Sequence, residues 1–287
     1  MRIMGKVTRL RVVAVLCCAL AVCQHVSAAN LLKESGENPL ATISQLPGFC
    51  SIFHSWGFIG DSLSSGELES RDADGTKGYH DFYEYSWGQR MCAAMGVKGE
   101  NYSQGGETTY GWIENFWNNP RNNNGNISAK TAPKQVYMIA LGANDRNVKF
   151  EAGDVKTDVD LADYAKNKRT FAGCYAGIIQ RVRTLEPRCK IFVVTEPGKP
   201  DDDAYNKVIR QMATTFDGVY VVDLQKWLGM KYGKNTDALK VYFTGGHLNA
   251  MGYQWSAWVM MTGIDWIIRH NMADFAKAGF IGTSLDY

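Results

Sequence analysis

Four short segments of the sequence carry the side chains that could perform chemistry. Their residues are Gly60-Asp61-Ser62-Leu63, Asn101-Tyr102-Ser103-Gln104-Gly105-Gly106-Glu107-Thr108, Gly142-Ala143-Asn144-Asp145 and Gly245-Gly246-His247-Leu248-Asn249. A serine hydroxyl becomes a nucleophile when a base takes its proton, and an imidazole is a base that titrates near neutral pH. An asparagine amide and the backbone N–H of a glycine can donate hydrogen bonds to a developing oxyanion. Together these residue types suit acyl transfer through a serine.

Each segment alone has an ordinary structural explanation. Gly-Asp-Ser is common in turns, and a pair of glycines is common in loops. Asn-Asp after a strand often caps a helix, and a single histidine is more often structural than catalytic. The four segments occur in one chain, each after an expected strand, and this combination favours a functional site.

Strands and helices alternate along the part of the chain that must position these segments. Strands are expected at 52–59, near 99–103, and at 135–141, 190–195 and 219–224; helices are expected at 83–95, 163–185, 204–216 and 250–270. This alternation predicts an α/β fold with a mostly parallel five-stranded sheet and helices on both faces. Right-handed crossovers place the carboxyl ends of the strands at one edge, where the ligand sites of open α/β sheets lie.

The four segments resemble the sequence blocks of the SGNH hydrolase superfamily, also called GDSL-type esterases and lipases. The similarity extends over roughly residues 58–267, with a full match to the Gly-Asp-Ser-Leu block. Gly106-x-Thr108 is similar to the second block, and Gly-x-Asn-Asp to the third. The resemblance implies a flavodoxin-like three-layer α/β/α sandwich and ester hydrolysis through an acyl-enzyme, without a cofactor. It implies Ser62 as nucleophile, His247 as general base, and an oxyanion hole formed by the N–H groups of Ser62 and Gly106 and the amide of Asn144.

The sequence departs from the family pattern at Thr244. The family usually has an aspartate three residues before the histidine, and such a carboxylate orients the imidazole. Three interpretations are open: a backbone carbonyl holds the ring and gives a Ser-His dyad, a distant acid replaces the aspartate, or the enzyme is weak or inactive. The candidate distant acids are Glu196, Asp201, Asp202, Asp203 and Asp223. The dyad is favoured because the other elements of the site are retained.

The first 28 residues are typical of a secretory signal peptide. Arg9 and Arg11 precede an apolar run at 12–22, and Val26-Ser27-Ala28 provides small residues for cleavage after Ala28 or Ala29. The run is too short to span a bilayer comfortably. An uncleaved anchor and a lipid attached at Cys23 are the alternatives. We expect a signal peptide at 1–28, an irregular leader at 29–50 and a single domain at 51–287, secreted or periplasmic, with no membrane span in the mature chain.

Charge and histidine spacing argue against two other classes of protein. The net charge is +2, and residues 1–28 contain four basic residues and no acidic one, so their removal leaves a net charge of −2. A chain without excess positive charge is a poor candidate for binding nucleic acid. The five histidines show no paired spacing typical of a metal site.

Four cysteines lie outside the expected signal peptide: Cys50, Cys92, Cys174 and Cys189. Export permits disulfides, and four cysteines allow three pairings that the sequence does not distinguish. Buried free thiols are the alternative.

The expected substrate is a small-molecule or polysaccharide ester. An exported hydrolase meets extracellular polymers, and Trp112 and Trp117, just after the second segment, are aromatic residues that suit sugar rings. No long apolar segment predicts a groove for an acyl chain. A short acyl group, foremost acetate on a carbohydrate, is therefore favoured. A lipase, lysophospholipase or thioesterase, and a carbohydrate-binding protein with a weak or lost activity, are the alternatives.

Overall fold

The central element of the computed structural model is a five-stranded sheet in which every neighbouring pair is parallel. The structure describes residues 37–120, 128–130, 132–229 and 237–287. The strand order is β4-β1-β5-β6-β7, formed by β1 (Ser55–Gly60), β4 (Lys98–Ser103), β5 (Val136–Ala140), β6 (Lys190–Val194) and β7 (Val219–Val222). The predicted mostly parallel five-stranded sheet is confirmed.

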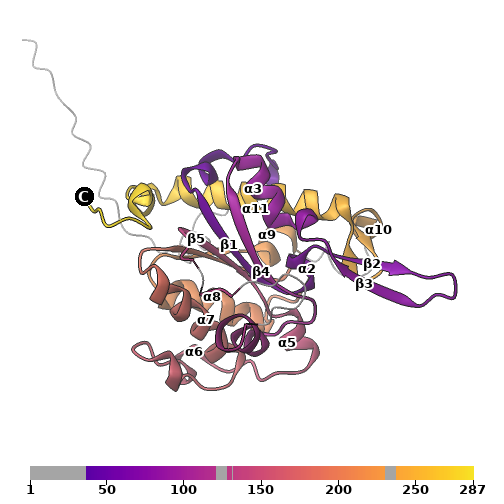
Figure 1. Cartoon of the computed structure of the whole chain (residues 1–287), viewed down its shortest axis with the longest axis horizontal. Helices are drawn as coiled ribbons and strands as arrows, with labels where there is room; N and C mark the ends of the chain where they lie inside the picture. Colours follow the sequence, from indigo (N-terminus) through magenta and orange to yellow (C-terminus); the bar gives the residue numbers. More distant parts are fainter. Residues whose placement is uncertain (1–36, 121–127, 131, 230–236) are drawn as a thin grey trace, which may run out of the picture.

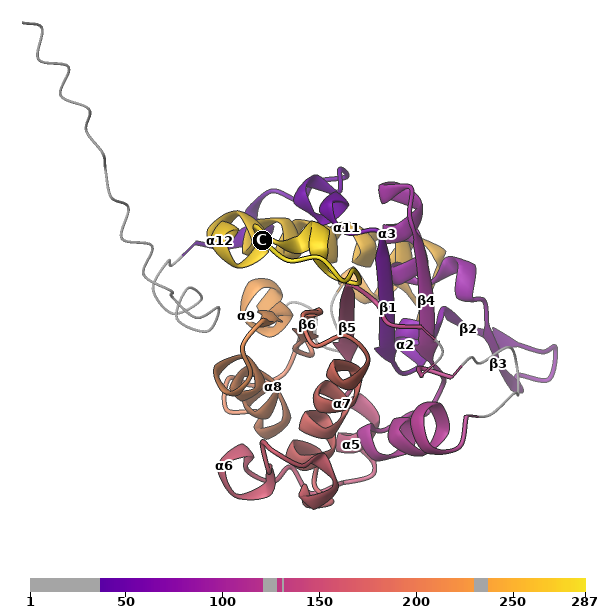
Figure 2. The ribbon, with the colours of Figure 1, turned by 60° about the vertical axis from the view of Figure 1, so that its left-hand side comes forward.

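Helices cover both faces of this sheet (Figures 1 and 2). α3 (Trp87–Met95) and α11 (Ala250–His270) pack together on one face, and α7 (Phe171–Leu185) and α8 (Ala204–Thr215) pack together on the other. The strands β1, β5, β6 and β7 are apolar and buried almost throughout, as expected for a parallel sheet covered on both sides, whereas the edge strand β4 is polar and buried only in its second half. The three-layer α/β/α sandwich is therefore confirmed.

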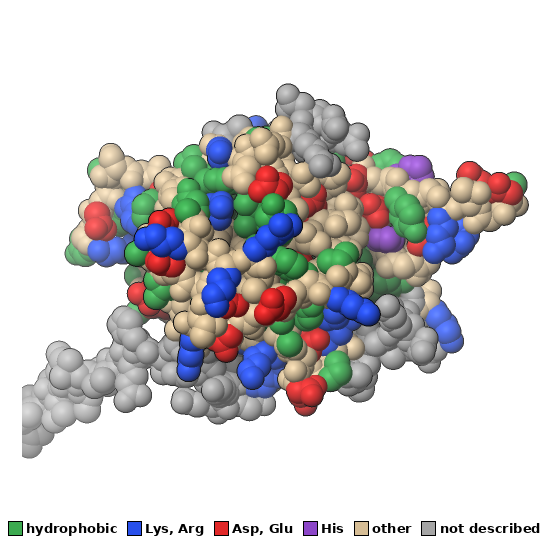
Figure 3. All heavy atoms as spheres, turned by 90° about the horizontal axis from the view of Figure 1, so that it is seen from below, with side chains coloured by type: hydrophobic (Ala, Val, Ile, Leu, Met, Phe, Trp, Pro, Cys, Tyr) green, Lys and Arg blue, Asp and Glu red, His purple; other side chains and the backbone are tan. Residues whose placement is uncertain are grey.

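The remaining elements are short. They are α2 (Ser62–Ser65), η3 (Tyr83–Tyr85), α4 (Thr109–Trp112), η4 (Ile113–Asn118), α5 (Ala143–Asn147), α6 (Val155–Asp158), η6 (Tyr164–Lys166), α9 (Leu224–Leu228), α10 (Asp237–Tyr242), α12 (Met272–Phe275) and η8 (Ala278–Phe280). On the face shown in Figure 3, acidic and basic side chains are interspersed.

Two antiparallel hairpins were not expected from the sequence. The strands β2 (Glu67–Arg71) and β3 (Lys77–Asp81) form an arm that projects from the body (Figures 1 and 2). The second hairpin pairs β8 (Phe243–Thr244) with β9 (His247–Leu248).

The helix expected at 163–185 begins later than its sequence pattern suggested. Residues 164–166 form the separate turn η6, and α7 starts at Phe171. Thr170 is extended and its hydroxyl accepts the Gly173 N–H at 3.2 Å, which makes Thr170 the N-cap of α7.

Part of the expected leader packs against the domain. η1 (Pro39–Ala41) and η2 (Gly48–Ile52) contact α11, and the Ser44 N–H donates to the Thr262 hydroxyl at 2.9 Å. The predicted signal peptide and Cys23 lie outside the described residues. Among the described helices, none is long and apolar enough to cross a membrane.

All four cysteines are buried free thiols in the structure. Burial raises the pKa of Cys92 and of Cys189 to about 12. A thiol that stays protonated is a poor nucleophile, so these side chains contribute to the fold through packing.

Gly88 lies where α3 packs closely against the sheet. A Cβ at this position would lie 2.6 Å from the ring of Phe58 on β1. Glycine inside a helix usually costs about 0.5–1 kcal/mol relative to alanine, but here the contact requires it. We predict that Gly88→Ala lowers the free energy of unfolding by about 1–3 kcal/mol because it overpacks the core.

Urea unfolding measures this loss. The matched control is Gly88→Ala in a Phe58→Leu background, where the smaller side chain leaves room and the further loss is smaller. A gain in stability from Gly88→Ala would contradict the packing argument.

Candidate active site

The site is built at the carboxyl ends of three neighbouring strands. β4, β1 and β5 are adjacent in the sheet, and the segments that contain Gly106, Ser62 and Asn144 follow them directly. The sheet topology therefore places the predicted nucleophile between the two segments predicted to supply the oxyanion donors.

Ser62 is the first residue of a one-turn helix. β1 ends at Gly60, and the Asp61 carboxylate caps α2 by accepting the Leu63 N–H at 3.0 Å. From α11, the buried Tyr253 hydroxyl lies 3.1 Å from the Ser62 carbonyl and 2.8 Å from the Glu67 carbonyl. These contacts fix the backbone around Ser62, whose own hydroxyl makes no hydrogen bond to the described residues.

The second and third segments are tied to each other. Asp145 is buried and accepts hydrogen bonds from the Thr109 N–H at 3.1 Å and the Thr109 hydroxyl at 2.6 Å. The Asn144 amide donates to the Glu107 carbonyl at 3.1 Å. An amide nitrogen has two hydrogens, so Asn144 keeps one for a ligand.

Two backbone N–H groups add to this donor set. Gly106 has a φ of +76°, a conformation that favours glycine. Within the described part of the chain, the backbone N–H groups of Ser62 and Gly106 donate to no other group. Three donors therefore remain available around the edge where Ser62 lies.

His247 lies in the β8–β9 hairpin, with Thr244 directly opposite across the turn Gly245-Gly246. Its Nε2 lies 2.9 Å from Glu67 Oε1, and its Nδ1 lies 3.7 Å from Glu69 Oε2. Both carboxylates come from β2, which the sequence analysis did not identify. The hydrogen bond to Glu67 raises the pKa of His247, partly opposed by burial, and the charge of Glu69 adds to the increase.

Glu69 is the more enclosed of the two carboxylates. Its side chain is 1% exposed and accepts the Gly246 N–H at 2.7 Å. Arg71 lies 3.0 Å and Lys77 3.6 Å from Glu69 Oε1. The Gly246 hydrogen bond and these cations hold the pKa of Glu69 below its ordinary value despite burial.

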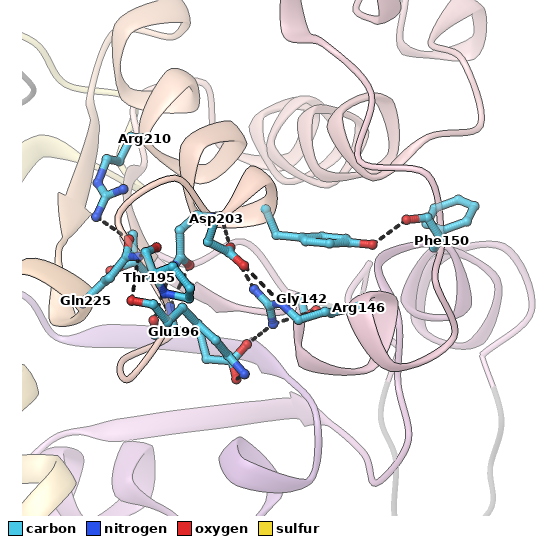
Figure 4. Close-up of polar contacts among 12 residues, drawn as sticks. Gly142, Arg146, Phe150, Thr195, Glu196, Asp203, Arg210 and Gln225 are labelled. Atoms are coloured by element: carbon cyan, nitrogen blue, oxygen red, sulfur yellow. Dashed lines mark hydrogen bonds and ion pairs between the residues drawn. The ribbon is translucent and has the colours of Figure 1, made fainter. Parts of the chain in front are cut away.

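Among the described residues, neither the expected backbone carbonyl nor any of the five acids named from the sequence holds the imidazole, although two other acids lie beside it. Nδ1 of His247 is buried and has no hydrogen-bond partner, so no backbone carbonyl holds it. The acids proposed from strand-end position are engaged elsewhere: Glu196 and Asp203 bind Arg146, as Figure 4 shows, and Asp223 binds Arg210 at 2.7 Å. Asp201 and Asp202 are exposed and make no contact with the ring.

Two other expectations are corrected. Trp112 and Trp117 are 0% and 7% exposed, so they belong to the core and cannot stack on a sugar. An apolar cavity of about 150 Å³ is lined in part by Asp61, Leu63 and Ser64, the neighbours of Ser62, although no long apolar segment predicted one. Its lining includes Leu63, Leu141, Val194, Leu224, Leu248 and Val259.

Among the described residues, no group of three or more His, Cys, Asp or Glu side chains is arranged to hold a metal ion.

A comparison with protein families adds to this geometry. The model of the GDSL-like lipase/acylhydrolase family matches residues 58–255. The chain belongs to this family. It is accordingly a hydrolase of ester bonds, and the resemblance noted from the four segments is confirmed.

Solved structures share the fold of this chain. An active-site mutant of a family two carbohydrate esterase from Clostridium thermocellum has a TM-score of 0.50 and 17% identity, over 77% of this chain and 64% of that one. A protein from Lactobacillus plantarum has a TM-score of 0.51 and 15% identity, over 75% and 97%. No curated protein sequence matches the chain.

The GDSL aspartate of this acylhydrolase, Asp61, has an unusual ionisation. Burial, with the nearby charges of Glu196 and Asp145, raises its pKa from an ordinary 3.8 to about 7, although the Leu63 hydrogen bond opposes the shift. The folded state therefore binds this proton more tightly than the unfolded state. The contribution of Asp61 to the free energy of unfolding is therefore complete below about pH 4 and is lost as the pH rises towards 7.

We predict that Asp61→Asn, which keeps a capping oxygen but cannot ionise, removes this loss. Urea unfolding at pH 5 and pH 8 would show a smaller fall in stability for the variant than for the wild type. An equal fall in both proteins would contradict the prediction.

Proposed function

We propose that this GDSL-family hydrolase is an exported serine esterase that removes short acyl groups, foremost acetyl, from carbohydrates. The observation that supports it best is the contact between α2, which begins at Ser62, and β9, which begins at His247, at the edge where the three donors lie. Among the described residues, the Ser62 hydroxyl has no hydrogen-bond partner, so it is available for attack. The basic and apolar pattern of residues 1–28 supports export.

The proposed reaction proceeds in two halves. Ser62 Oγ attacks the ester carbonyl carbon while Nε2 of His247 takes its proton, and the N–H groups of Ser62 and Gly106 and the Asn144 amide stabilise the oxyanion. Collapse breaks the bond to the alcohol, which receives the proton from His247. Water then attacks the acyl-enzyme and loses a proton to His247. Collapse of this second intermediate breaks the bond between the acyl carbon and Ser62 Oγ, which takes the proton back from His247 as the acid is released. Before the first attack, Nε2 exchanges its contact with Glu67 for one with Ser62.

The exposed aromatic residues of the hairpin arm favour a carbohydrate as the substrate. Tyr79 on β3 is 51% exposed, and its ring centroid lies 5.3 Å from that of His247. Phe82 and Tyr85, at the base of the arm, are also exposed and contact each other. Exposed aromatic faces suit sugar rings. A family two carbohydrate esterase with this fold is described in complex with cellohexaose.

The apolar cavity favours a second candidate, an acylhydrolase for longer chains of the lipase, lysophospholipase or thioesterase type. In another protein, an apolar cavity of about 150 Å³ binds benzene. The cavity next to Asp61 and Leu63 could hold several methylenes of an acyl chain. The two candidates differ in the acyl length that they predict.

Hydrolysis of p-nitrophenyl acetate, butyrate and octanoate by the mature chain tests both candidates. We predict turnover that declines with chain length and is lost by at least about 10³-fold in Ser62→Ala, which removes the nucleophile. A maximum at octanoate would favour the longer-chain candidate. Turnover that persists in Ser62→Ala would contradict a serine mechanism.

A substitution at Tyr79 tests whether the substrate is a carbohydrate that stacks on this ring. We predict that Tyr79→Ala raises KM for an acetylated polysaccharide about tenfold, because a stacking contact is lost, and leaves KM for p-nitrophenyl acetate within about twofold. Acetate release measures the first and p-nitrophenol absorbance the second. The exposed Tyr287, at the chain end, is the control position for an aromatic-to-alanine change. Equal effects on both substrates would contradict sugar stacking.

A further inference from the structure

The turn that carries His247 is shaped around Glu69. Gly246 donates its N–H to Glu69 Oε2, and a Cβ at Gly245 would overlap the Glu69 carboxylate. Gly245 also has a φ of +65°, so glycine is required there for two reasons. The Glu69 carboxylate thus occupies the turn between Thr244 and His247 and approaches the ring from that side.

Position 244 would otherwise supply the carboxylate. Residues directly opposite in an antiparallel pair point to the same face, so an acidic side chain at 244 would lie beside the ring of His247. Thr244 has no carboxylate and is exposed. Glu69 reaches the same region from β2, at a separation of 177 residues from Gly246.

The two nitrogens of the ring distinguish the two carboxylates. Glu67 contacts Nε2, which in the proposed reaction must be free to accept the Ser62 proton. Glu69 faces Nδ1, the buried nitrogen that has no other hydrogen-bond partner among the described residues. A hydrogen on Nδ1 directed at Glu69 leaves the lone pair on Nε2 available as the base.

The groups around Glu69 stabilise its ionised form, which is the form that can accept a hydrogen bond from Nδ1. An ionised carboxylate only accepts hydrogen bonds, and Arg71, Lys77 and the Gly246 N–H stabilise its charge. The 3.7 Å between Nδ1 and Oε2 is too long for a hydrogen bond, so a small rotation of the ring away from Glu67 is needed to form one.

We propose that Glu69 is the positioning residue that orients His247 in place of the carboxylate absent at position 244. The proposal rests on the proposed function, in which His247 is the base for Ser62. The carboxylate therefore comes from the hairpin arm after the nucleophile segment and not from the segment that contains the histidine.

The first experiment compares Glu69→Gln with the wild type on p-nitrophenyl acetate. We expect kcat to fall about 10²- to 10⁴-fold with little change in KM, as expected when the orienting acid of a serine hydrolase is neutralised. Loss of a negative charge beside the ring also lowers the pKa of His247. The midpoint of the rising limb of kcat/KM against pH should therefore move to lower pH, which a purely structural role would not produce.

The second experiment is a rescue. Thr244→Asp alone should leave kcat within about tenfold of the wild type or raise it, and in the Glu69→Gln background it should recover at least tenfold of the lost kcat. Glu186→Gln is the matched control, because Glu186 is also buried and accepts a backbone N–H, that of Gly282 at 2.8 Å. Glu186 lies before β6, at the opposite end of the strands from the site, so we expect Glu186→Gln to leave the midpoint of the pH profile unchanged.

Several results would overturn the proposal. They are an unchanged kcat and pH midpoint in Glu69→Gln, a loss of kcat that Thr244→Asp does not recover, or a loss confined to Glu67→Gln. If Glu69→Gln does not fold, Glu69→Asp takes its place, with a reduced kcat and a retained pH midpoint expected and an unchanged kcat contradicting the proposal. Wild-type turnover that does not depend on Ser62 would instead refute the proposed function.

Discussion

The buried carboxylate of Glu69 is the group on which the arrangement around His247 depends. It accepts the Gly246 N–H and lies beside Nδ1 of His247, so one side chain contacts both the turn and the imidazole. A buried charge is costly unless it is paired and hydrogen-bonded. Arg71 and Lys77 supply that compensation from the same arm, which means that the arm brings the acid together with the charges that stabilise it.

The rest of the site follows from the order of the strands. The strands β4, β1 and β5 are neighbours, so the segments that follow them lie close together at one edge of the sheet. Contacts between segments then set the finer geometry: Asp145 holds Thr109, and Asn144 is bonded to the Glu107 carbonyl. From α11, Tyr253 contacts the backbone of both Ser62 and Glu67, and so connects the turn that contains Ser62 with the start of the hairpin arm.

The sequence was sufficient to predict the sheet, the helices that cover it, and the position of the Ser62, Gly106 and Asn144 segments at strand ends. It did not predict that His247 lies in a separate hairpin. Strands buried on both faces are continuous apolar runs, which are easily recognised, and strand ends in a parallel sheet share an edge. The hairpin arm was not predicted because β2 and β3 are short and rich in charged residues; the Asp74-Gly75 pair between them was the one available turn signal. The contact between Glu69 and Gly246 joins residues 177 apart, which no local pattern encodes. The sequence likewise could not indicate that Trp112 and Trp117 face the core.

The tautomer of His247 is the most direct test of this account. ¹⁵N NMR of the imidazole, at a pH above its pKa, distinguishes a hydrogen on Nδ1 from one on Nε2. In Glu67→Gln, which removes the carboxylate that faces Nε2, we predict a neutral ring with its hydrogen on Nδ1. We also predict a change in the Nδ1 signal in Glu69→Gln that is absent in Glu186→Gln. A hydrogen on Nε2 in Glu67→Gln, with the Nδ1 signal unaffected by Glu69→Gln, would contradict both expectations.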